Sequence, residues 1–379
     1  MTYRVISLMA VLVLFAIGCI RQDPPSNPFR APITYPVGKS PSHLVAADLN
    51  EDGVLDLAVA NTEDRSLTIL FGKNDGSFPE TVNLKVGKQP RWVVSGDFNE
   101  DKKGDLAVVD NDEDNLYILL NQGGGRFQKT DSYETGRSPY SATVNDFNGD
   151  HHLDMAVVSR FDRLIILLGK GDGTFLEGMV GDPGAIPTGI ISGDYNNDSL
   201  IDLAIANNGS TSNDFVLFWG KGDGTFTKGE RYKTGMQPLG LISEDFNRDN
   251  HPDILVINGM RDSLTLFIHE KKGTFSKLRD LGADGGPASA VAADFNKDGL
   301  LDMVIVSSRS NSISFISGKG DGAFHYPPLN IFTGVAPFFV LAEDFNVDGN
   351  IDLAVVNNED HTLSILMGRW IPKDPKKEG

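Results

Sequence analysis

The stretch DLNEDGVLDLAVA at residues 48–60 is an acidic loop followed at once by an apolar run. Its pattern is D-x-N-x-D-x-x-x-D before a short apolar segment, and the intervals between its seven copies are 48 to 51 residues. The copies begin at Asp48, Asp97, Asp146, Asp194, Asp245, Asp294 and Asp344. A period this regular indicates stacked copies of one supersecondary unit, because a single unit cannot bury its own apolar face.

Each copy contains four segments with the character of β-strands. A G-x-x-P turn, in which Asp284 replaces the glycine in the sixth copy, leads into an apolar strand such as 44–47. The acidic loop leads into a second strand such as 57–60. A third strand, such as 67–70, ends in a G-x-x-x-G-x-F turn before a more polar fourth strand. Consecutive apolar positions are typical of strands covered on both faces, and polarity suits an outer edge. We therefore expect an all-β fold, a seven-bladed β-propeller of four-stranded antiparallel blades.

The repeats place the propeller at residues 29–370. The expected blades are about 38–86, 87–135, 136–183, 184–234, 235–283, 284–333 and 334–370. The last copy stops after its third strand, whereas residues 29–37 align with the fourth strand of other copies. We expect this N-terminal strand to complete the last blade, which removes an exposed sheet edge. Residues 371–379, rich in Lys and Pro, are expected to form a flexible tail.

The N-terminus has the pattern of an exported lipoprotein. In residues 1–18, one cation precedes an apolar stretch too short to span a membrane, which predicts a signal peptide. The tetrapeptide AIGC resembles the bacterial lipobox, in which the cysteine, here Cys19, is lipidated; Ala16 departs from the usual Leu. The alternative is an ordinary secretory signal with an incidental cysteine. With lipidation, residues 19–28 are expected to be the lipidated cysteine and a Pro-rich tether that spaces the propeller from the lipid. We expect a lipid anchor at the bacterial cell envelope, in the outer membrane or facing the periplasm.

The acidic loops also have the chemistry of cation sites. Counted from its first Asp, each loop offers carboxylates at positions one, five and nine, an amide at three and a backbone carbonyl at seven. Calcium prefers such oxygens, whereas magnesium demands a stricter octahedron. We predict up to seven structural Ca²⁺ ions, with ligands Asp48, Asn50, Asp52, Val54, Asp56, Asp97, Asn99, Asp101, Lys103, Asp105, Asp146, Asn148, Asp150, His152, Asp154, Asp194, Asn196, Asp198, Leu200, Asp202, Asp245, Asn247, Asp249, His251, Asp253, Asp294, Asn296, Asp298, Leu300, Asp302, Asp344, Asn346, Asp348, Asn350 and Asp352.

Position six decides how well each loop suits an ion. The chain must turn sharply there, and glycine does so without steric cost. Gly53, Gly299 and Gly349 favour sites one, six and seven, while Lys102 makes site two the weakest. The alternative is an Asx-rich turn without an ion. Without metal, the clustered carboxylates would repel one another and destabilise the loop.

The repeat resembles the FG-GAP/VCBS family, whose members form seven-bladed propellers like the head of integrin α subunits. The resemblance rests on D-F-N-x-D-G-x-x-D before Leu-Ala-Val, and on GKGDGTF at residues 169–175 and 220–226. It implies calcium in the loops of one propeller face and ligand recognition on the opposite face. The family also includes domains attached to enzymes, so the resemblance leaves the function open.

The face opposite the acidic loops should carry the loops between strands two and three and the G-x-x-P turns. Arginine and aromatic side chains gathered there suit an anionic, carbohydrate or protein ligand. The alternative is that the aromatic rings pack between blades and the arginines are solvated. The candidate ligand residues are Arg65, Arg91, Trp92, Tyr140, Arg160, Arg163, Arg261, Arg309 and Phe338.

The net charge and the lack of catalytic motifs exclude several classes of function. The net charge of −18, without a basic stripe, argues against nucleic acid as a partner. The chain contains no nucleophile elbow, phosphate loop or metalloprotease motif, and Cys19 is its only cysteine. We expect a monomeric, calcium-stabilised module without enzymatic activity, which binds a protein or glycan or serves as a scaffold. The alternatives are a calcium-dependent polysaccharide lyase or hydrolase, and a lectin.

Overall fold

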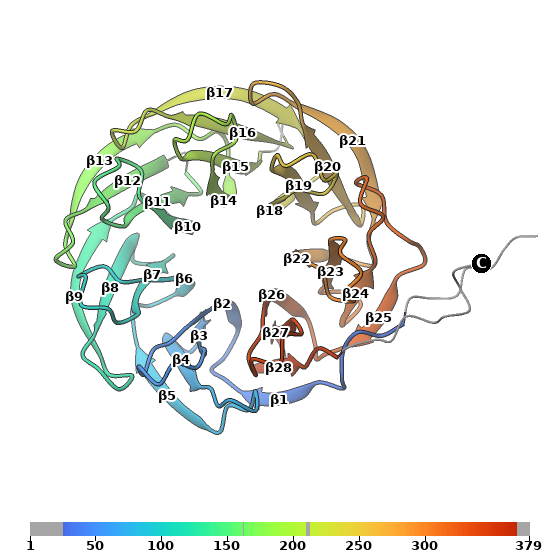
Figure 1. The fold of residues 1–379 in the computed structure, drawn as a ribbon. Helices are drawn as coiled ribbons and strands as arrows, with labels where there is room; N and C mark the ends of the chain where they lie inside the picture. Colours follow the sequence, from blue (N-terminus) through green and yellow to red (C-terminus); the bar gives the residue numbers. More distant parts are fainter. Residues whose placement is uncertain (1–25, 162, 210–212, 370–379) are drawn as a thin grey trace, which may run out of the picture.

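The computed structural model describes residues 26–161, 163–209 and 213–369. These residues form 28 strands in seven four-stranded antiparallel sheets. Figure 1 shows the sheets arranged around a central opening, with β2, β6, β10, β14, β18, β22 and β26 nearest to it. The predicted all-β, seven-bladed propeller is therefore confirmed. The predicted signal peptide, Cys19 and the predicted C-terminal tail lie outside the described residues.

The four strands of every blade follow the order seen in the sequence. The innermost strands are β2 (Pro41–Ala47), β6 (Pro90–Gly96), β10 (Pro139–Asn145), β14 (Pro187–Gly193), β18 (Pro238–Glu244), β22 (Pro287–Ala293) and β26 (Pro337–Glu343). The second strands are β3 (Asp56–Asn61), β7 (Asp105–Asp110), β11 (Asp154–Ser159), β15 (Asp202–Asn208), β19 (Asp253–Asn258), β23 (Asp302–Ser307) and β27 (Asp352–Asn357).

The outer half of each blade is completed by two more strands. The third strands are β4 (Ser66–Phe71), β8 (Asn115–Asn121), β12 (Arg163–Gly169), β16 (Asn213–Gly220), β20 (Ser263–His269), β24 (Ser312–Ile316) and β28 (Thr362–Leu366). The outermost strands are β5 (Glu80–Lys85), β9 (Phe127–Glu134), β13 (Phe175–Gly181), β17 (Phe226–Lys233), β21 (Phe275–Gly282), β25 (Leu329–Phe332) and β1 (Ile33–Pro36).

Burial follows the predicted polarity of the strands. Every residue of β3, β7, β11, β19, β23 and β27 is buried, whereas β5 and β9 are mostly exposed. Each innermost strand begins at the proline of its turn, which is G-x-x-P in six blades and D-x-x-P in the sixth, and a register shift against the second strand follows. Proline is tolerated there because an edge position does not need its missing N–H.

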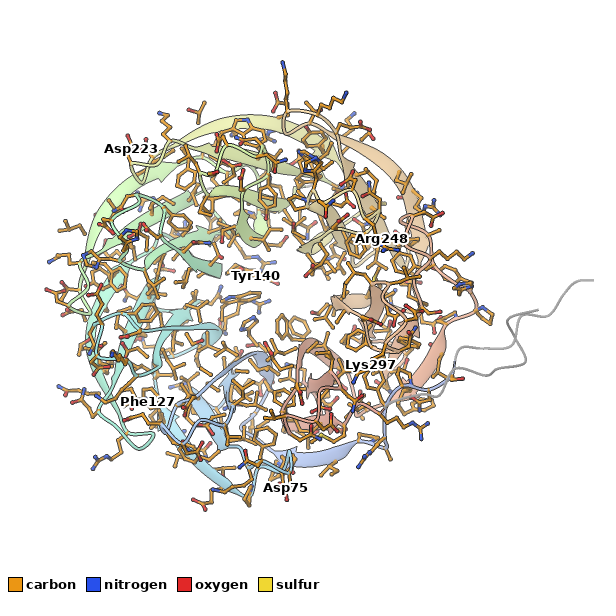
Figure 2. The ribbon with its side chains drawn as sticks, viewed as in Figure 1. Asp75, Phe127, Tyr140, Asp223, Arg248 and Lys297 are labelled. Carbon is orange, nitrogen blue, oxygen red and sulfur yellow. The ribbon has the colours of Figure 1, made fainter. Side chains whose placement is uncertain are left out.

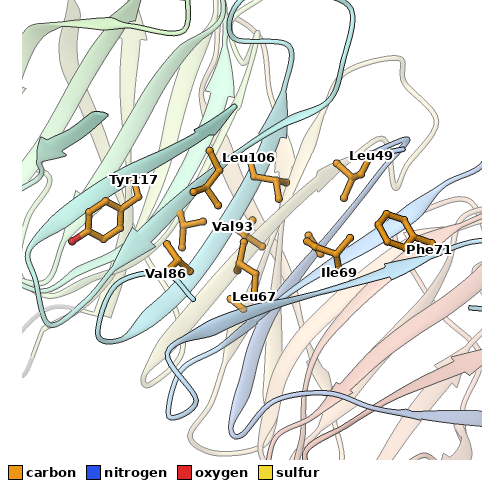
Figure 3. Close-up of a cluster of buried hydrophobic side chains, with 12 residues drawn as sticks. Leu49, Leu67, Ile69, Phe71, Val86, Val93, Leu106 and Tyr117 are labelled. Carbon is orange, nitrogen blue, oxygen red and sulfur yellow. The ribbon is translucent and has the colours of Figure 1, made fainter. Parts of the chain in front are cut away.

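The hydrophobic core lies between blades rather than within them. In one cluster, Leu67 and Ile69 of the first blade pack with Val93 and Leu106 of the second (Figure 3). Six further clusters join the other neighbouring blades in the same way, including the seventh and the first. Because each blade shares its apolar faces with both neighbours, the ring is stable only when it is closed.

The N-terminal segment closes the ring as predicted. Strand β1 pairs antiparallel with β28, with Ile33 opposite Ile365 and Pro36 opposite Thr362. Phe29 forms an isolated bridge with Gly368 and is 1% exposed. The first and last described segments therefore belong to one sheet. Among the described residues, no helix is suited to crossing a membrane.

The antiparallel order separates two faces of the propeller. The acidic face holds the seven acidic loops and the turns between strands three and four, as the bond from Gly72 N to Asp56 Oδ1 illustrates (2.8 Å). The proline face holds the G-x-x-P turns and the loops between strands two and three. There, Thr62 Oγ1 donates to Pro90 O (3.0 Å) and Asn111 Nδ2 to Pro139 O (3.0 Å).

Candidate functional sites

The seven acidic loops share one internal hydrogen-bond pattern. In the first, Asp48 Oδ2 accepts from Gly53 N (2.9 Å) and Asp52 Oδ1 accepts from Val54 N (2.9 Å). The bond from position six to position one recurs in every copy at 2.7–2.9 Å. The bond from position seven to position five recurs at 2.8–3.0 Å. These bonds use one lone pair of each oxygen and leave others for a cation.

The Asp at position nine is a buried anchor of each blade. Asp56 is fully buried, and its two oxygens accept hydrogen bonds from Leu49 N (2.9 Å) and Gly72 N (2.8 Å). Burial raises the pKa of this Asp to about 6 in six copies and to about 7 at Asp302. In each copy the carboxylates at positions five and one raise it further. The three acids therefore lie close enough to disfavour one another's charge.

The donor set of the loops suits a hard cation. It contains only carboxylate, amide and carbonyl oxygens, the ligands that calcium prefers. In the sixth loop, Asn296 Oδ1 is buried and has no hydrogen-bond partner. In the first loop, by contrast, Asn50 Oδ1 accepts from Asp52 N (2.9 Å). The sixth loop therefore holds an unsatisfied oxygen among its carboxylates, and a bound cation would satisfy it.

The candidate ligand side chains of each acidic loop do not converge on a single position for an ion. In the part of the chain that the structure describes, no group of three His, Cys, Asp or Glu side chains could hold a metal ion as placed. The carboxylates at positions one and five face their own loop amides instead. The second loop also contains its own cation, because Lys103 Nζ lies 2.7 Å from Asp101 Oδ2. Calcium in these loops stays a prediction, and site two stays the weakest candidate.

Two positions of each loop adopt the left-handed backbone conformation. Position six has φ between 65° and 86° in all seven copies, which is the sharp turn expected there. Position four has φ between 55° and 78°, a feature that the sequence analysis missed. Only Gly149 and Asn197 could have indicated it, since the other copies carry Glu51, Glu100, Arg248, Lys297 and Val347 at this position.

Neighbouring acidic loops contact each other around the ring. His152 at position seven of the third loop lies with Nδ1 2.5 Å from Glu100 Oε1 at position four of the second. His251 of the fifth loop lies with Nδ1 2.8 Å from Asn197 Nδ2 of the fourth. The repeat pattern indicated only a role for the backbone carbonyl at position seven. It could not predict these contacts because they join residues about 50 positions apart.

The opposite end of the central channel contains a cavity of about 320 Å³, lined by residues of all seven innermost strands. The cavity is one-sided, because the second residue after each proline differs between blades. These residues are His43, Trp92, Ser141, Gly189, Gly240, Ser289 and Phe339. The rings of blades seven, one and two pack together, with His43 3.6 Å from Trp92 and 4.1 Å from Phe339 between centroids. The small residues Gly189, Gly240 and Ser289 line the cavity from blades four, five and six.

Comparison with known proteins agrees with the repeat pattern. A family model described as FG-GAP-like repeat matches residues 48–108, 97–157, 146–205, 194–256 and 245–305. The chain belongs to this family. The overlapping matches each run from one acidic loop of an FG-GAP-like repeat into the second strand of the next blade. No curated protein matches the chain significantly in sequence.

Solved structures share the fold of this FG-GAP-like propeller at low sequence identity. A structure described as BBS1N in complex with ARL6DN has a TM-score of 0.65 and 15% identity over 90% of this chain and 97% of that one. A putative 6-phosphogluconolactonase from Bacteroides uniformis has a TM-score of 0.60 and 13% identity, over 78% and 87%. A protein from Lactobacillus plantarum has a TM-score of 0.59 and 14% identity, over 79% and 86%. At these sequence identities the similarities show the fold alone. The name of the lactonase is therefore no evidence for catalysis by this chain.

The predicted ligand residues of the FG-GAP-like propeller fall into two groups. The central group, Arg91, Trp92, Tyr140 and Phe338, lines the cavity. The Arg91 guanidinium lies 3.7 Å from the Tyr140 ring centroid and 5.9 Å from that of Phe338. Arg160 lies 4.9 Å from the same Tyr140 ring (labelled in Figure 2). Three blades therefore contribute to one aromatic and cationic cluster.

The other predicted ligand residues lie apart from the cavity on separate, exposed parts of the proline face. They are Arg65, Arg163, Arg261 and Arg309, of which Arg309 pairs with Asp262. Exposed apolar side chains also lie on this face, among them Phe161, Met236 and Met260. Arg137 stacks on Phe161 at 4.6 Å. The methionines were missed, because nothing in the sequence distinguishes an exposed apolar residue in a turn from a buried one.

Proposed function

We propose that this FG-GAP-like propeller is a calcium-stabilised recognition module, held at the bacterial cell envelope through lipid on Cys19. The family and the fold agree with a binding or scaffold module. The observation that carries the proposal is the division between the two faces. The acidic face uses its carboxylates within its own loops, whereas the proline face exposes arginines and apolar side chains. The ligand is a protein or a glycan bound on the proline face.

Calcium has a structural role in this proposal. The position-one, -three, -five and -nine side chains of each loop, with the carbonyl at position seven, would hold the ion. Burial, and then repulsion from the carboxylates at positions five and one, raises the pKa of Asp56 and its equivalents, and the charge of the ion would offset this repulsion. Because all seven loops are built alike, none is set apart as a catalytic site.

Calcium dependence is tested by thermal unfolding of the mature domain with excess chelator and with millimolar calcium. We expect a higher melting temperature with calcium, and bound calcium by elemental analysis, since an ion that binds only the folded state stabilises it. Equal melting temperatures and no bound metal would remove calcium from the proposal. Asp298→Asn is expected to lower the calcium content by up to one ion, whereas Asp321→Asn, outside the loops, leaves it unchanged.

The proline face is tested by capture of ligands from glycan and protein arrays. We expect Phe161→Ala and Arg163→Ala to reduce capture without lowering the melting temperature. Leu176→Ala is the matched control, because Leu176 on outer strand β13 is 57% exposed and Phe161 is 61% exposed. Unchanged capture by both proline-face variants, or equal loss in the control, contradicts recognition by this face.

The envelope anchor is tested by cell fractionation of the full chain. We expect the wild-type protein in the membrane fraction with a mass increase that corresponds to lipid. Cys19→Ser should remove both, because the thiol is the attachment point in the proposal. A membrane-bound Cys19→Ser variant would rule out this anchor.

A further inference from the structure

We propose that the cavity at the proline-face end of the central channel binds a small monoanion, a carboxylate with an apolar aliphatic or aromatic body. This inference rests on the proposed recognition role of the proline face and names a second ligand for it. The carboxylate would contact Arg91, and the apolar body would lie against blades four to six.

The walls of the cavity are apolar on the side away from Arg91. Strands β14, β18 and β22 contribute mainly Ile, Leu and Ala side chains there, together with Gly189 and Gly240. A Cβ at Gly240 would meet only Ile257 Cδ1, at 3.5 Å. Gly240 therefore lines the cavity with room for a Cβ, and an apolar group that lies against it is removed from water.

The side chains that line the cavity carry positive charge only. Arg91 is the only charged residue among those that line it, and no acidic residue does. Across residues 26–161, 163–209 and 213–369, Arg91 forms no salt bridge, and its Nε is buried without a hydrogen-bond partner. A guanidinium in this state is suited to a carboxylate, which it can bind through two hydrogen bonds.

The orientation of Arg91 is set before a ligand binds. Its guanidinium is stacked on Tyr140 at 3.7 Å and lies 5.9 Å from the Phe338 ring, so rings of two other blades hold it at the cavity. Arg160 on the same Tyr140 ring adds positive potential. A preorganised donor loses little freedom on binding, which favours affinity.

The size of the cavity selects a small ligand. Its volume of about 320 Å³ lies at the lower end of ligand pockets in proteins, which span about 300–1,000 Å³. A single medium-length acyl chain or one aromatic ring system with a carboxylate is of this size, whereas a polysaccharide segment or a folded domain is not. Decanoate is therefore a suitable probe, with decanol and acetate as the uncharged and headgroup-only comparisons.

Trp92 lines the cavity and supplies the readout. In a full-length protein carrying Trp219→Phe and Trp370→Phe, only Trp92 remains as a tryptophan. We expect decanoate to change its emission saturably, decanol to bind about ten- to hundredfold more weakly, and acetate to have no effect, because a charge-assisted hydrogen bond and apolar burial are both needed. An unsaturable response, or equal binding of decanol and decanoate, overturns the proposal even without further variants.

Three variants in that background locate the site. Arg91→Met should weaken decanoate about ten- to hundredfold and leave decanol unchanged, since it removes the charge and keeps the length. Gly240→Leu should weaken both by filling the cavity. Arg126→Met, on the acidic face, should change neither. Full decanoate binding by folded Arg91→Met and Gly240→Leu proteins, shown by unchanged circular dichroism, refutes the assignment.

The two proposals for the proline face fail independently. If the protein does not bind decanoate but still captures array ligands in a way that depends on Phe161 and Arg163, only the cavity proposal is contradicted. If decanoate binds saturably but Phe161→Ala and Arg163→Ala leave array capture unchanged, only the proposal of a protein or glycan ligand is contradicted.

Discussion

At the scale of single residues, the acidic loops contain backbone strain that their side chains do not reveal. Position four is left-handed in every copy, and Val347 has φ of 55° while being 75% exposed. A β-branched residue is rarely found in this conformation, because its Cβ crowds the backbone. The strain is retained because the hydrogen bonds of Asp344 to the amides of Asp348 and Gly349 hold the loop in one shape.

Val347→Asn is expected to raise the free energy of unfolding by about 1 kcal/mol, because Asn tolerates the left-handed region better than Val. Urea unfolding in excess chelator measures this change. Gly53→Ala is the opposite control. A Cβ there meets no atom within 4 Å, so only φ of 81° opposes it, and we expect a loss of about 1 kcal/mol. A destabilised Val347→Asn protein contradicts the strain argument.

A buried histidine makes stability depend on pH. Burial lowers the pKa of His43 to about 3, with a further lowering by Arg91. Between that value and the usual value of about 6.5, the unfolded chain binds a proton that the folded protein does not. The contribution of His43 to stability is therefore present above pH 6.5 and is lost as pH falls.

His43→Phe keeps a flat ring between Trp92 and Phe339 but removes the titrating group. We expect the difference in unfolding free energy, wild type minus variant, to fall by about 1.4 kcal/mol per pH unit below about pH 6.5. Urea titrations at pH 7, 6 and 5 measure it. Wild type is compared with His43→Phe because the buried Asp residues at position nine change stability with pH in the opposite sense. Their raised pKa values favour folding at lower pH, and this effect is the same in both proteins. A constant difference would show that His43 does not titrate in this range.

At the scale of one blade, the position-nine Asp connects the acidic loop to the third strand. Asp56 accepts one backbone N–H on each oxygen, from Leu49 and from Gly72. The same residue was predicted as a metal ligand, and its buried hydrogen bonds add a purely structural role. A carboxylate is required because two acceptors must face two donors.

Asp56→Asn is therefore expected to lower the free energy of unfolding by about 2–3 kcal/mol in chelator, since the amide NH₂ would face a backbone N–H. Asp52→Asn is the matched control, because Asp52 is exposed in the same loop and should cost less than about 1 kcal/mol without metal. Chemical unfolding of both variants measures the difference. Equal costs would mean that Asp56 acts only through a bound ion.

At the scale of the whole molecule, stability depends on ring closure. Each apolar cluster is shared by two blades, so an open seventh blade would expose two of them. The N-terminal segment prevents this: Phe29 packs 5.4 Å from Phe295 and 6.2 Å from Phe315 between ring centroids. Residues distant in sequence thus form the last interface of the ring.

Phe29→Ala should lower the free energy of unfolding by about 3–5 kcal/mol, the usual cost of removing a buried Phe. Phe332→Ala is the control, because Phe332 is 75% exposed and its loss should change stability by less than about 0.5 kcal/mol. Thermal and urea unfolding compare the two. A small effect at Phe29 would show that closure contributes little.

The sequence by itself determined the architecture, because a propeller is periodic and its signals are local. The proline turn before the first strand, the apolar second strands and the fourth-strand character of residues 29–37 are each evident within one repeat, and each is found in the structure. Position six of the loops was predicted for the same reason, since a sharp turn depends on a few neighbouring residues.

Only the tertiary structure decided what the ring brings together. Arg91, Tyr140 and Phe338 lie in three blades, and their contact depends on how closure orients innermost strands that are far apart in the sequence. The cavity has the same origin: Gly240 lies on one side of it and the packed rings of blades seven, one and two lie on the other, and only ring closure brings the two sides together. Local pattern specifies each blade, whereas the binding surface is set by packing between blades, which no single repeat encodes.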